Sequence, residues 1–213
     1  QVFEEEGGHQ ALMEANRKEM ERIIEKRRGK SKFDVIVAYS GGKDSSFALM
    51  QLQEKYGLKV LAYLVDNNFV ADQAKINATE FTGKLGVDLL IFKPNPKFMN
   101  KMYTTSLNGD LYNVSQLSRA NAACLSCINL INNFVLDEAV RRHIPIIAGG
   151  YIEGQVPAHT GVINMDNKMI STFRNKNRKF LSEKIDPRFD DYLNIAEPAQ
   201  GEQHPVFINP LLG

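Results

Sequence analysis

The alternation of apolar runs and helical patterns in the first half of the chain constrains its fold most. An apolar run rich in β-branched residues covers 33–39, a second apolar run covers 58–65, and a shorter run covers 88–92. Helical patterns at 45–56 and 72–85 separate them. Continuous apolar runs of this length are typical of strands buried in a parallel sheet. Strand and helix at this spacing predict right-handed βαβ units, so we expect an α/β fold with a doubly wound, Rossmann-like parallel sheet.

The rest of the chain divides into recognisable parts. Further helices and a fourth strand are predicted at 9–28, 97–106, 125–142 and 144–148. Beyond residue 152 the chain is rich in Asn, Pro, Gly and charge, and this pattern predicts no core strand. We expect a helical extension (1–30), a ligand-binding domain (31–152) and an irregular extension of that domain that covers its site (153–213).

Composition narrows the class of protein. The chain has 213 residues, of which 43% are hydrophobic, and this suits one α/β domain with a small appendage. A net charge of +1 provides no global basic field that would attract nucleic acid. No apolar stretch approaches the roughly 20 residues that span a bilayer, and two cysteines are too few for a secreted disulfide framework. We expect a cytoplasmic protein that does not enter a membrane.

The segment SGGKDSS (residues 40–46) lies between the first strand and the helix that follows it. A strand that runs through a glycine-rich turn into a helix directs free backbone amides and the positive end of the helix dipole at one spot. Gly41 and Gly42 permit positive φ and let phosphates approach the backbone. Hydroxyl donors and a mobile positive charge come from Ser40, Lys43, Ser45 and Ser46.

Two familiar phosphate loops do not match this segment. A Walker A loop would have Ser or Thr after Gly42-Lys43, where this chain has Asp44, and a glycine five residues before Gly42. The dinucleotide pattern G-x-G-x-x-G is also absent. A carboxylate beside phosphates is favourable when Mg²⁺ lies between them, so Asp44 is predicted to be a magnesium ligand.

The segment resembles the PP-loop family of ATP pyrophosphatases, whose signature S-G-G-x-D-S residues 40–45 match in full. The resemblance implies an adenine nucleotide α-hydrolase-like (HUP) fold that uses ATP and Mg²⁺. It implies cleavage between the α- and β-phosphates, which leaves AMP on an oxygen of an acceptor until nitrogen or sulfur displaces it. Lys43 and Asp44 would then be catalytic, and the remaining residues of the signature would hold the pyrophosphate.

The resemblance also implies where the nucleoside lies. In this family the end of the second strand cradles adenine, and the glycines after the fourth strand help to close the site. The expected nucleotide contacts are therefore Ala38, Tyr39, Ser40, Gly41, Gly42, Lys43, Asp44, Ser45, Ser46, Leu64, Val65, Asp66, Gly149 and Gly150.

Cys124 and Cys127 form a C-x-x-C pair at the start of the helix predicted at 125–142. A helix N-terminus lowers the pKa of a thiol and favours the thiolate that metals and nucleophilic chemistry need. Two cysteines cannot complete a four-ligand Zn²⁺ or Fe–S site. The remaining metal ligands would have to come from a partner subunit or from the histidines of the chain, which are His9, His143, His159 and His204. Alternatively, both cysteines are small buried residues of the core.

Two types of PP-loop enzyme carry a C-x-x-C in this place. Bacterial N-acetyl sugar amidotransferases resemble the chain over residues 33–150, which implies nitrogen transfer with ammonia from a partner glutaminase. tRNA thiolases imply a sulfur-donor partner, with Cys124 or Cys127 as persulfide carrier or metal ligand, although those enzymes use a third cysteine that this chain lacks. We favour nitrogen transfer onto a small carbonyl acceptor such as a sugar, by a homodimer. Sulfur transfer to tRNA or a small molecule is the alternative, and a non-catalytic nucleotide-binding module of the universal-stress type is a third.

Two polar stretches near the C-terminus are weaker candidates. Glu153 and His159 follow the fourth strand in a segment with the composition of an active-site lid. The basic run RNKNRK would clamp phosphates or an anionic substrate, or would simply be a solvated face. Its cations are Arg174, Lys176, Arg178 and Lys179.

Overall fold

The computed structural model describes residues 6–109, 111–118, 120–153 and 155–213. A six-stranded sheet in the order β3-β2-β1-β4-β6-β5 forms the centre of the molecule. All neighbouring strands are parallel except β5, which runs antiparallel to β6. The strands are β1 (Val35–Ala38), β2 (Val60–Val65), β3 (Asp88–Phe92), β4 (Ile146–Gly149), β5 (Val162–Asn164) and β6 (Val206–Ile208). The expected doubly wound α/β fold is confirmed.

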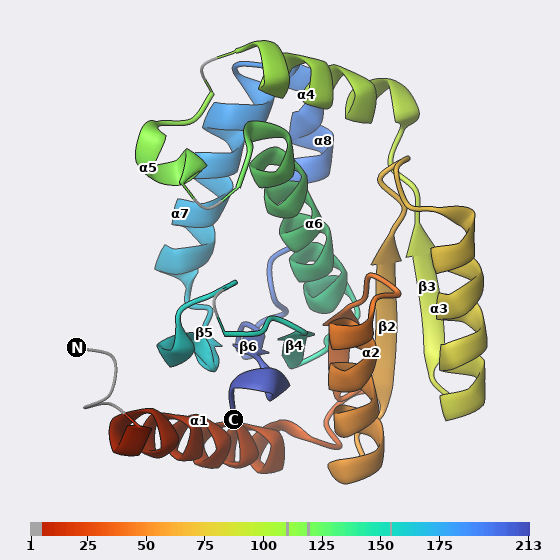
Figure 1. Cartoon of the computed structure of the whole chain (residues 1–213), viewed down its shortest axis with the longest axis vertical. Coiled ribbons are helices and arrows are strands. Elements are labelled where there is room, and N and C mark those ends of the chain that lie inside the picture. Colours follow the sequence, from red (N-terminus) through yellow and green to blue (C-terminus); the bar gives the residue numbers. More distant parts are fainter. Residues whose placement is uncertain (1–5, 110, 119, 154) are drawn as a thin grey trace.

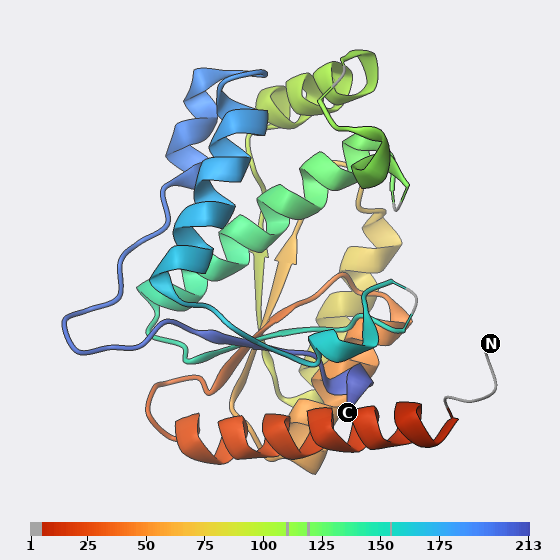
Figure 2. The ribbon, with the colours of Figure 1, turned by 90° about the vertical axis from the view of Figure 1, so that its left-hand side faces the viewer.

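Helices cover both faces of this sheet (Figures 1 and 2). The helices are α1 (Glu6–Arg27), α2 (Lys43–Met50), α3 (Asp72–Leu85), α4 (Pro96–Asn108), α5 (Val114–Leu117), α6 (Ala122–Arg141), α7 (Asn167–Asn177) and α8 (Asp190–Leu193). One hydrophobic core contains Met20 of α1, Leu49 of α2 and Ala78 of α3. The other contains Met102 of α4 and Leu130 of α6. Because the central strands are buried on both faces, their sequences are continuous apolar runs rather than alternating ones.

The helix α6 belongs to the core of the molecule. In the described part of the chain it is the one helix whose length and hydropathy alone would allow it to span a membrane. Half of that apolar window is buried within the molecule, and Leu130, Phe134 and Leu136 lie in the second core. A helix packed in this way is apolar because it is buried by the sheet and its neighbours.

The C-terminal segment completes the sheet, which corrects the expectation that no core strand follows residue 152. The strand β6 pairs with β4, and β5 pairs with β6. Val206 and Ile208 are buried to 1% and 0% exposure. Strands of three residues are too short for a pattern in the sequence to distinguish them from loops. The addition of β6 beside β4 was therefore visible only in the folded chain.

Both ends of the described chain lie on the same side of the sheet (Figure 1). The Asn16 side chain of α1 donates hydrogen bonds to the carbonyl oxygens of Ala158 and Leu212, each at 2.8 Å. A Cβ atom added to Gly213 would lie 2.9 Å from the backbone of Arg17. The first helix and the last turn therefore pack directly against each other.

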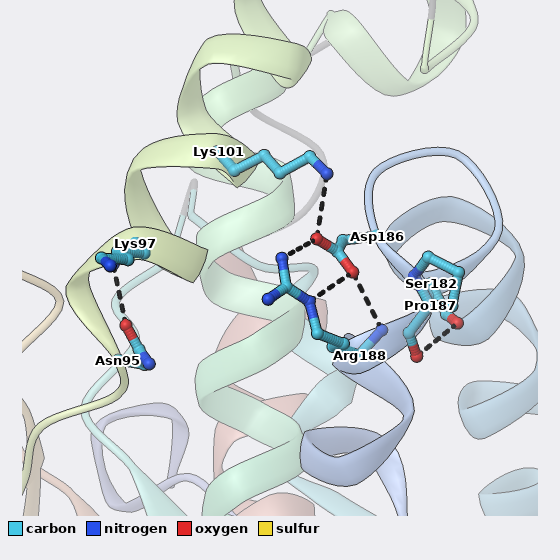
Figure 3. Close-up of polar contacts among 7 residues, drawn as sticks. All are labelled: Asn95, Lys97, Lys101, Ser182, Asp186, Pro187 and Arg188. Atoms are coloured by element: carbon cyan, nitrogen blue, oxygen red, sulfur yellow. Dashed lines mark hydrogen bonds and ion pairs between the residues drawn. The ribbon is translucent and has the colours of Figure 1, made fainter.

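Ion pairs between the buried carboxylate of Asp186 and two exposed cations join α4 to the C-terminal segment (Figure 3). Lys101 of α4 donates to Asp186 at 2.9 Å, and the guanidinium of Arg188 donates to both carboxylate oxygens of Asp186 at 3.0 and 2.7 Å. The hydrogen bond from Arg188, followed by that from Lys101, holds the pKa of Asp186 well below its usual value. The carboxylate of Asp186 is therefore charged and fully paired in the folded protein.

The order of the strands creates a crevice at one edge of the sheet. The chain proceeds outward from β1 to β2 and β3, then returns through α6 to β4 on the other side of β1. The strand order therefore changes direction between β1 and β4, and ligands of open α/β sheets bind beyond the carboxyl ends of the strands at such a point.

Candidate functional site

The loop at residues 40–46 joins β1 to α2 at this crevice. Gly41 has φ +75°, and a Cβ atom there would lie 2.8 Å from the carbonyl oxygen of Ala74 in α3. Glycine is therefore required by conformation and by space. Gly42 caps α2 without a side-chain hydrogen bond. The amides in the first turn of α2 consequently have no side-chain cap and are available to an anionic ligand.

The hydroxyl groups of the loop shape it from within. Ser45 is 6% exposed, and its Oγ lies 3.1 Å from the carbonyl oxygen of Gly42 and 3.0 Å from Ser40 Oγ. The amides of Ser40 and Gly42 donate to Ser45 Oγ and Ser40 Oγ, both at 3.3 Å. Ser46 bonds to the Tyr39 hydroxyl at 3.0 Å, and burial raises the pKa of Tyr39. Ser45 and Ser46 thus hold the loop in shape, whereas Ser40 is exposed beside the cleft.

A cleft of about 480 Å³ lies in front of the loop. Of the predicted nucleotide contacts, Ala38, Tyr39, Ser40, Gly42, Lys43, Asp44, Ser45, Leu64, Val65 and Gly150 line it. Tyr63, which belongs to the strand segment 62–65 expected beside the adenosine, also lines it. Sequence reasoning missed the other lining residues, which are Asn67, Val70, Ile128, Ile131, Tyr151 and Gln155. The loop contributes the polar wall, and the ends of β1, β2 and the start of α6 contribute the apolar walls. The cleft therefore combines a phosphate-type loop with an apolar surface suited to a base.

Asp66 lies at the end of β2 and is not among the residues that line the cleft. Its carboxylate accepts a hydrogen bond from the Asn68 amide at 3.1 Å and pairs with Lys75 and Lys93 at 3.4 and 3.5 Å. Burial alone would raise the pKa of Asp66, but the amide and the two ammonium groups outweigh burial and lower this pKa. The side chain stabilises the turn after β2 beside the site.

Gly149, the last residue of β4, and Gly150, which follows it, serve different purposes. A Cβ atom on Gly150 would lie 2.7 Å from the Ser45 backbone, so this glycine lets the segment pack directly on the first turn of α2. A Cβ atom on Gly149 would lie 2.5 Å from the Tyr151 ring. Gly149 therefore makes room for Tyr151, and Gly150 alone of the pair lines the cleft.

The cysteine pair lies on the first turns of α6, as predicted. The N-cap side chain of Asn121 accepts a hydrogen bond from the Cys124 amide at 2.8 Å. Cys124 is exposed, whereas Cys127 is buried and accepts from Asn67 Nδ2 and Tyr103 OH, both at 3.2 Å. Burial, reinforced by the bond to Cys127, raises the pKa of Tyr103. Since Asn67 lines the cleft, a single side chain connects Cys127 with it.

The described residues do not complete a metal centre at the cysteines. Among them, no group of three or more His, Cys, Asp and Glu side chains could hold a metal ion. His9 lies 3.5 Å from Glu153, His143 lies 2.8 Å from Glu202, and His204 bonds to Asn167. His159 lies on the short turn 158–160. A Zn²⁺ or Fe–S centre therefore does not fit the residues that the structure describes. By contrast, one carboxylate beside a phosphate loop, as at Asp44, fits the way Mg²⁺ binds together with phosphates.

The basic run near the C-terminus lies apart from the cleft. Arg174 pairs with Glu197 at 3.8 Å, and Arg178 pairs with Asp190 at 3.0 Å. Neither they nor Lys179 line the cleft, and the side chain of Lys176 lies outside the described residues. Glu153 faces His9, whereas Gln155 on the same segment reaches the cleft.

Comparisons with known proteins give partial likenesses. No family model matches the chain. The uncharacterized protein MJ1599 of Methanocaldococcus jannaschii is 38% identical over 120 residues, which are 55% of this chain and 38% of that protein. The chain therefore spans well under two thirds of this relative.

Solved structures with similar folds have low sequence identity. The U34-tRNA thiolase NcsA from Methanococcus maripaludis, with its 4Fe–4S cluster, is 17% identical with a TM-score of 0.49, over 93% of this chain and 60% of that chain. The NMN synthetase from Francisella tularensis is 16% identical with a TM-score of 0.44, over 92% and 77%. The NH3-dependent NAD synthetase from Campylobacter jejuni is 15% identical with a TM-score of 0.44, over 68% and 57%. Any proposal about function therefore depends on the loop at residues 40–46 and the cleft around it.

Proposed function

We propose that the chain is a PP-loop ATP pyrophosphatase that binds ATP with Mg²⁺ in the cleft. The observation that carries this proposal is the complete S-G-G-K-D-S segment, folded with an uncapped α2 N-terminus that faces a cleft. The pyrophosphate part of ATP lies against the amides of the loop, with Ser40 and Lys43 as further donors. Asp44 holds Mg²⁺, and the adenosine lies against Leu64 and Val65.

The proposed reaction is adenylation followed by displacement. An oxygen of the acceptor's carbonyl group attacks the α-phosphorus of ATP, and the bond to the β-phosphate breaks to release pyrophosphate. Mg²⁺ held at Asp44 would supply positive charge to neutralise the departing phosphates. A nitrogen nucleophile then attacks the activated carbon, and AMP leaves with the acceptor's oxygen. The apolar ends of β1 and β2 limit the access of water to the activated acceptor.

Nitrogen is the preferred donor in this proposal. Ammonia comes from a partner glutaminase, the acceptor is a small molecule with a carbonyl group, and the enzyme acts in the cytoplasm as a homodimer. The support for nitrogen is the resemblance to sugar amidotransferases over residues 33–150, together with the lack of a complete metal centre among the described residues.

Sulfur transfer to tRNA or a small molecule is the second candidate, and one contact favours it. Cys127 accepts a hydrogen bond from Asn67, which lines the cleft. Sulfur carried by the cysteine pair would therefore be separated from the cleft only by the Asn67 side chain. Cys124→Ser and Cys127→Ser variants separate the donors. Persulfide chemistry requires a thiol and stops in these variants, whereas ammonia-dependent amidation continues.

Product analysis tests the proposed reaction. The protein is incubated with ATP, Mg²⁺, a pool of carbonyl acceptors and either ammonia or sulfide, and the nucleotides are separated. We expect AMP and pyrophosphate, with at least a hundredfold loss in Asp44→Ala. The matched control Asp191→Ala removes an exposed carboxylate of α8 and leaves turnover unchanged. ADP and phosphate as products, or equal turnover in both variants, contradict the proposal.

A further inference from the structure

A second cavity of about 330 Å³ adjoins the cleft on the α6 side of the sheet. The two hollows share Ala38, Ile128 and Tyr151 as common walls. The far side of the second cavity is formed by β4, β5 and β6, where Ile147, Ile163 and Phe207 lie. It therefore exists because the C-terminal strands extend the sheet beyond β4.

The lining of this cavity is almost entirely hydrocarbon. Thr160 lines it, but its hydroxyl already donates to the Pro157 carbonyl oxygen at 2.6 Å. Within the described part of the chain, the Asn132 amide has no hydrogen-bond partner, and it is half-buried on α6. Apolar cavities with a few placed polar groups are the usual form of small-molecule sites. The volume is roughly twice the ~150 Å³ of an apolar cavity that accommodates benzene.

Tyr151 separates this cavity from the nucleotide cleft. Its ring lies over Gly149, where no side chain intervenes, and its centroid is 6.2 Å from that of Phe207. Because Gly150 packs on the first turn of α2, Tyr151 lies one residue from the phosphate loop. A molecule whose body fills the second cavity would therefore place its free end at the boundary beside the loop.

We infer that the second cavity binds the body of the acceptor, and that this body is aromatic or branched aliphatic. The inference rests on the proposed adenylation. It identifies the acceptor as an apolar acid or amide rather than a bare sugar. The carbonyl group lies at the Tyr151 boundary, where its oxygen faces the α-phosphate. The hydroxyl groups of a sugar would lose their hydrogen bonds to water in this cavity, and the Asn132 amide could replace only some of them. Binding of a sugar would therefore cost free energy.

Equilibrium binding tests the inference. Phenylacetate, 4-methylpentanoate and indole-3-acetate are titrated by calorimetry against glucuronate, a polar acid, with and without α,β-methylene-ATP. We expect at least one apolar acid to bind at least tenfold more tightly than glucuronate. Val156→Phe narrows the cavity, and we expect it to weaken binding of that acid at least tenfold. Binding of the ATP analogue should remain unchanged within twofold.

Ile152→Phe is the matched control, because Ile152 is 41% exposed on the same segment and lines neither hollow. We expect Ile152→Phe to leave the affinities for the apolar acid and for the ATP analogue unchanged. Asn132→Ala is a second variant, which removes the amide without filling the cavity. We expect it to weaken binding of the acid several-fold. The inference is overturned if no apolar acid binds better than glucuronate, or if Val156→Phe leaves the acid unaffected. Loss of the ATP analogue in Val156→Phe also overturns it, because the cavity would then hold adenine.

The two proposals fail differently. If the ATP analogue does not bind to the unaltered protein, the nucleotide site is refuted, whereas the titration without nucleotide still measures the apolar acid. If the analogue binds and the acids do not, the nucleotide site stands and the acceptor subsite is refuted.

Discussion

Gly41 shows how a single residue allows the loop at residues 40–46 to form. Its φ of +75° lies in the left-handed region, and its missing side chain lets the loop approach α3. These two requirements are separate, because the positive φ concerns the backbone of Gly41 itself, whereas the close approach concerns the carbonyl oxygen of Ala74. Gly29 has nearly the same φ, +74°, but no atom lies within 4 Å of a Cβ placed there. The chain thus contains a natural pair that separates the two effects.

Alanine at these two positions measures each demand. Gly29→Ala is expected to lower the free energy of unfolding by roughly 1 kcal/mol, the cost of a left-handed conformation. Gly41→Ala is expected to cost more, because the loop must also move away from Ala74, and to weaken ATP binding at least tenfold. Urea unfolding and calorimetric titration give the two quantities. Equal losses of stability with ATP binding intact would mean that the loop tolerates displacement.

At the scale of elements, α6 joins the features of the site. Its first turns carry the cysteine pair, and Ile128 and Ile131 on the next turn line the cleft. Asn132 and Val135, four and seven residues after Ile128, continue the same face into the second cavity. The position of this helix therefore determines the walls of both hollows.

The N-cap of α6 is predicted to stabilise this arrangement. Asn121→Ala removes the hydrogen bond to the Cys124 amide, and we expect a loss of about 1 kcal/mol in the free energy of unfolding. Asn121→Asp keeps an acceptor oxygen and should retain the stability of the unaltered protein. If Asp and Ala behave alike in urea unfolding, the cap has no role.

At the scale of the whole molecule, the C-terminal segment is attached at several distant places. It adds β6 to the sheet, packs against α1, and pairs Asp186 with Lys101 of α4. These contacts link residues that lie 60, 196 and 85 positions apart in the chain. We therefore expect the described elements to unfold together rather than piece by piece.

Asp186 gives this linkage a pH dependence. Its pKa in the folded state lies below the unfolded value, so its contribution to stability is complete above pH 3.8 and is lost as pH falls through the folded pKa. Asp186→Asn should lower the free energy of unfolding at pH 7 and flatten its decline at acid pH. The comparison is made by urea unfolding between pH 7 and pH 3, with the exposed Asp191→Asn as control. An acid decline as steep as that of the unaltered protein would contradict this assignment.

Local patterns in the sequence determined the first four strands, their crossover helices and the phosphate loop. The apolar runs and the S-G-G-K-D-S segment act over neighbouring residues, so no knowledge of the fold is needed to recognise them. The residues of the loop could be predicted as a site for the same reason. The position of the cysteine pair at a helix N-terminus was equally local.

Only the tertiary structure decided what surrounds that loop. The strands β5 and β6 are too short to recognise alone, and they become strands because β4 offers an unpaired edge. Asn67 reaches Cys127 across 60 residues, and Tyr151 forms a wall between two hollows because Gly149 leaves it room. Such contacts depend on how distant elements pack. The sequence alone therefore predicts the loop at residues 40–46, whereas the shape of the second cavity follows from the packing of distant elements.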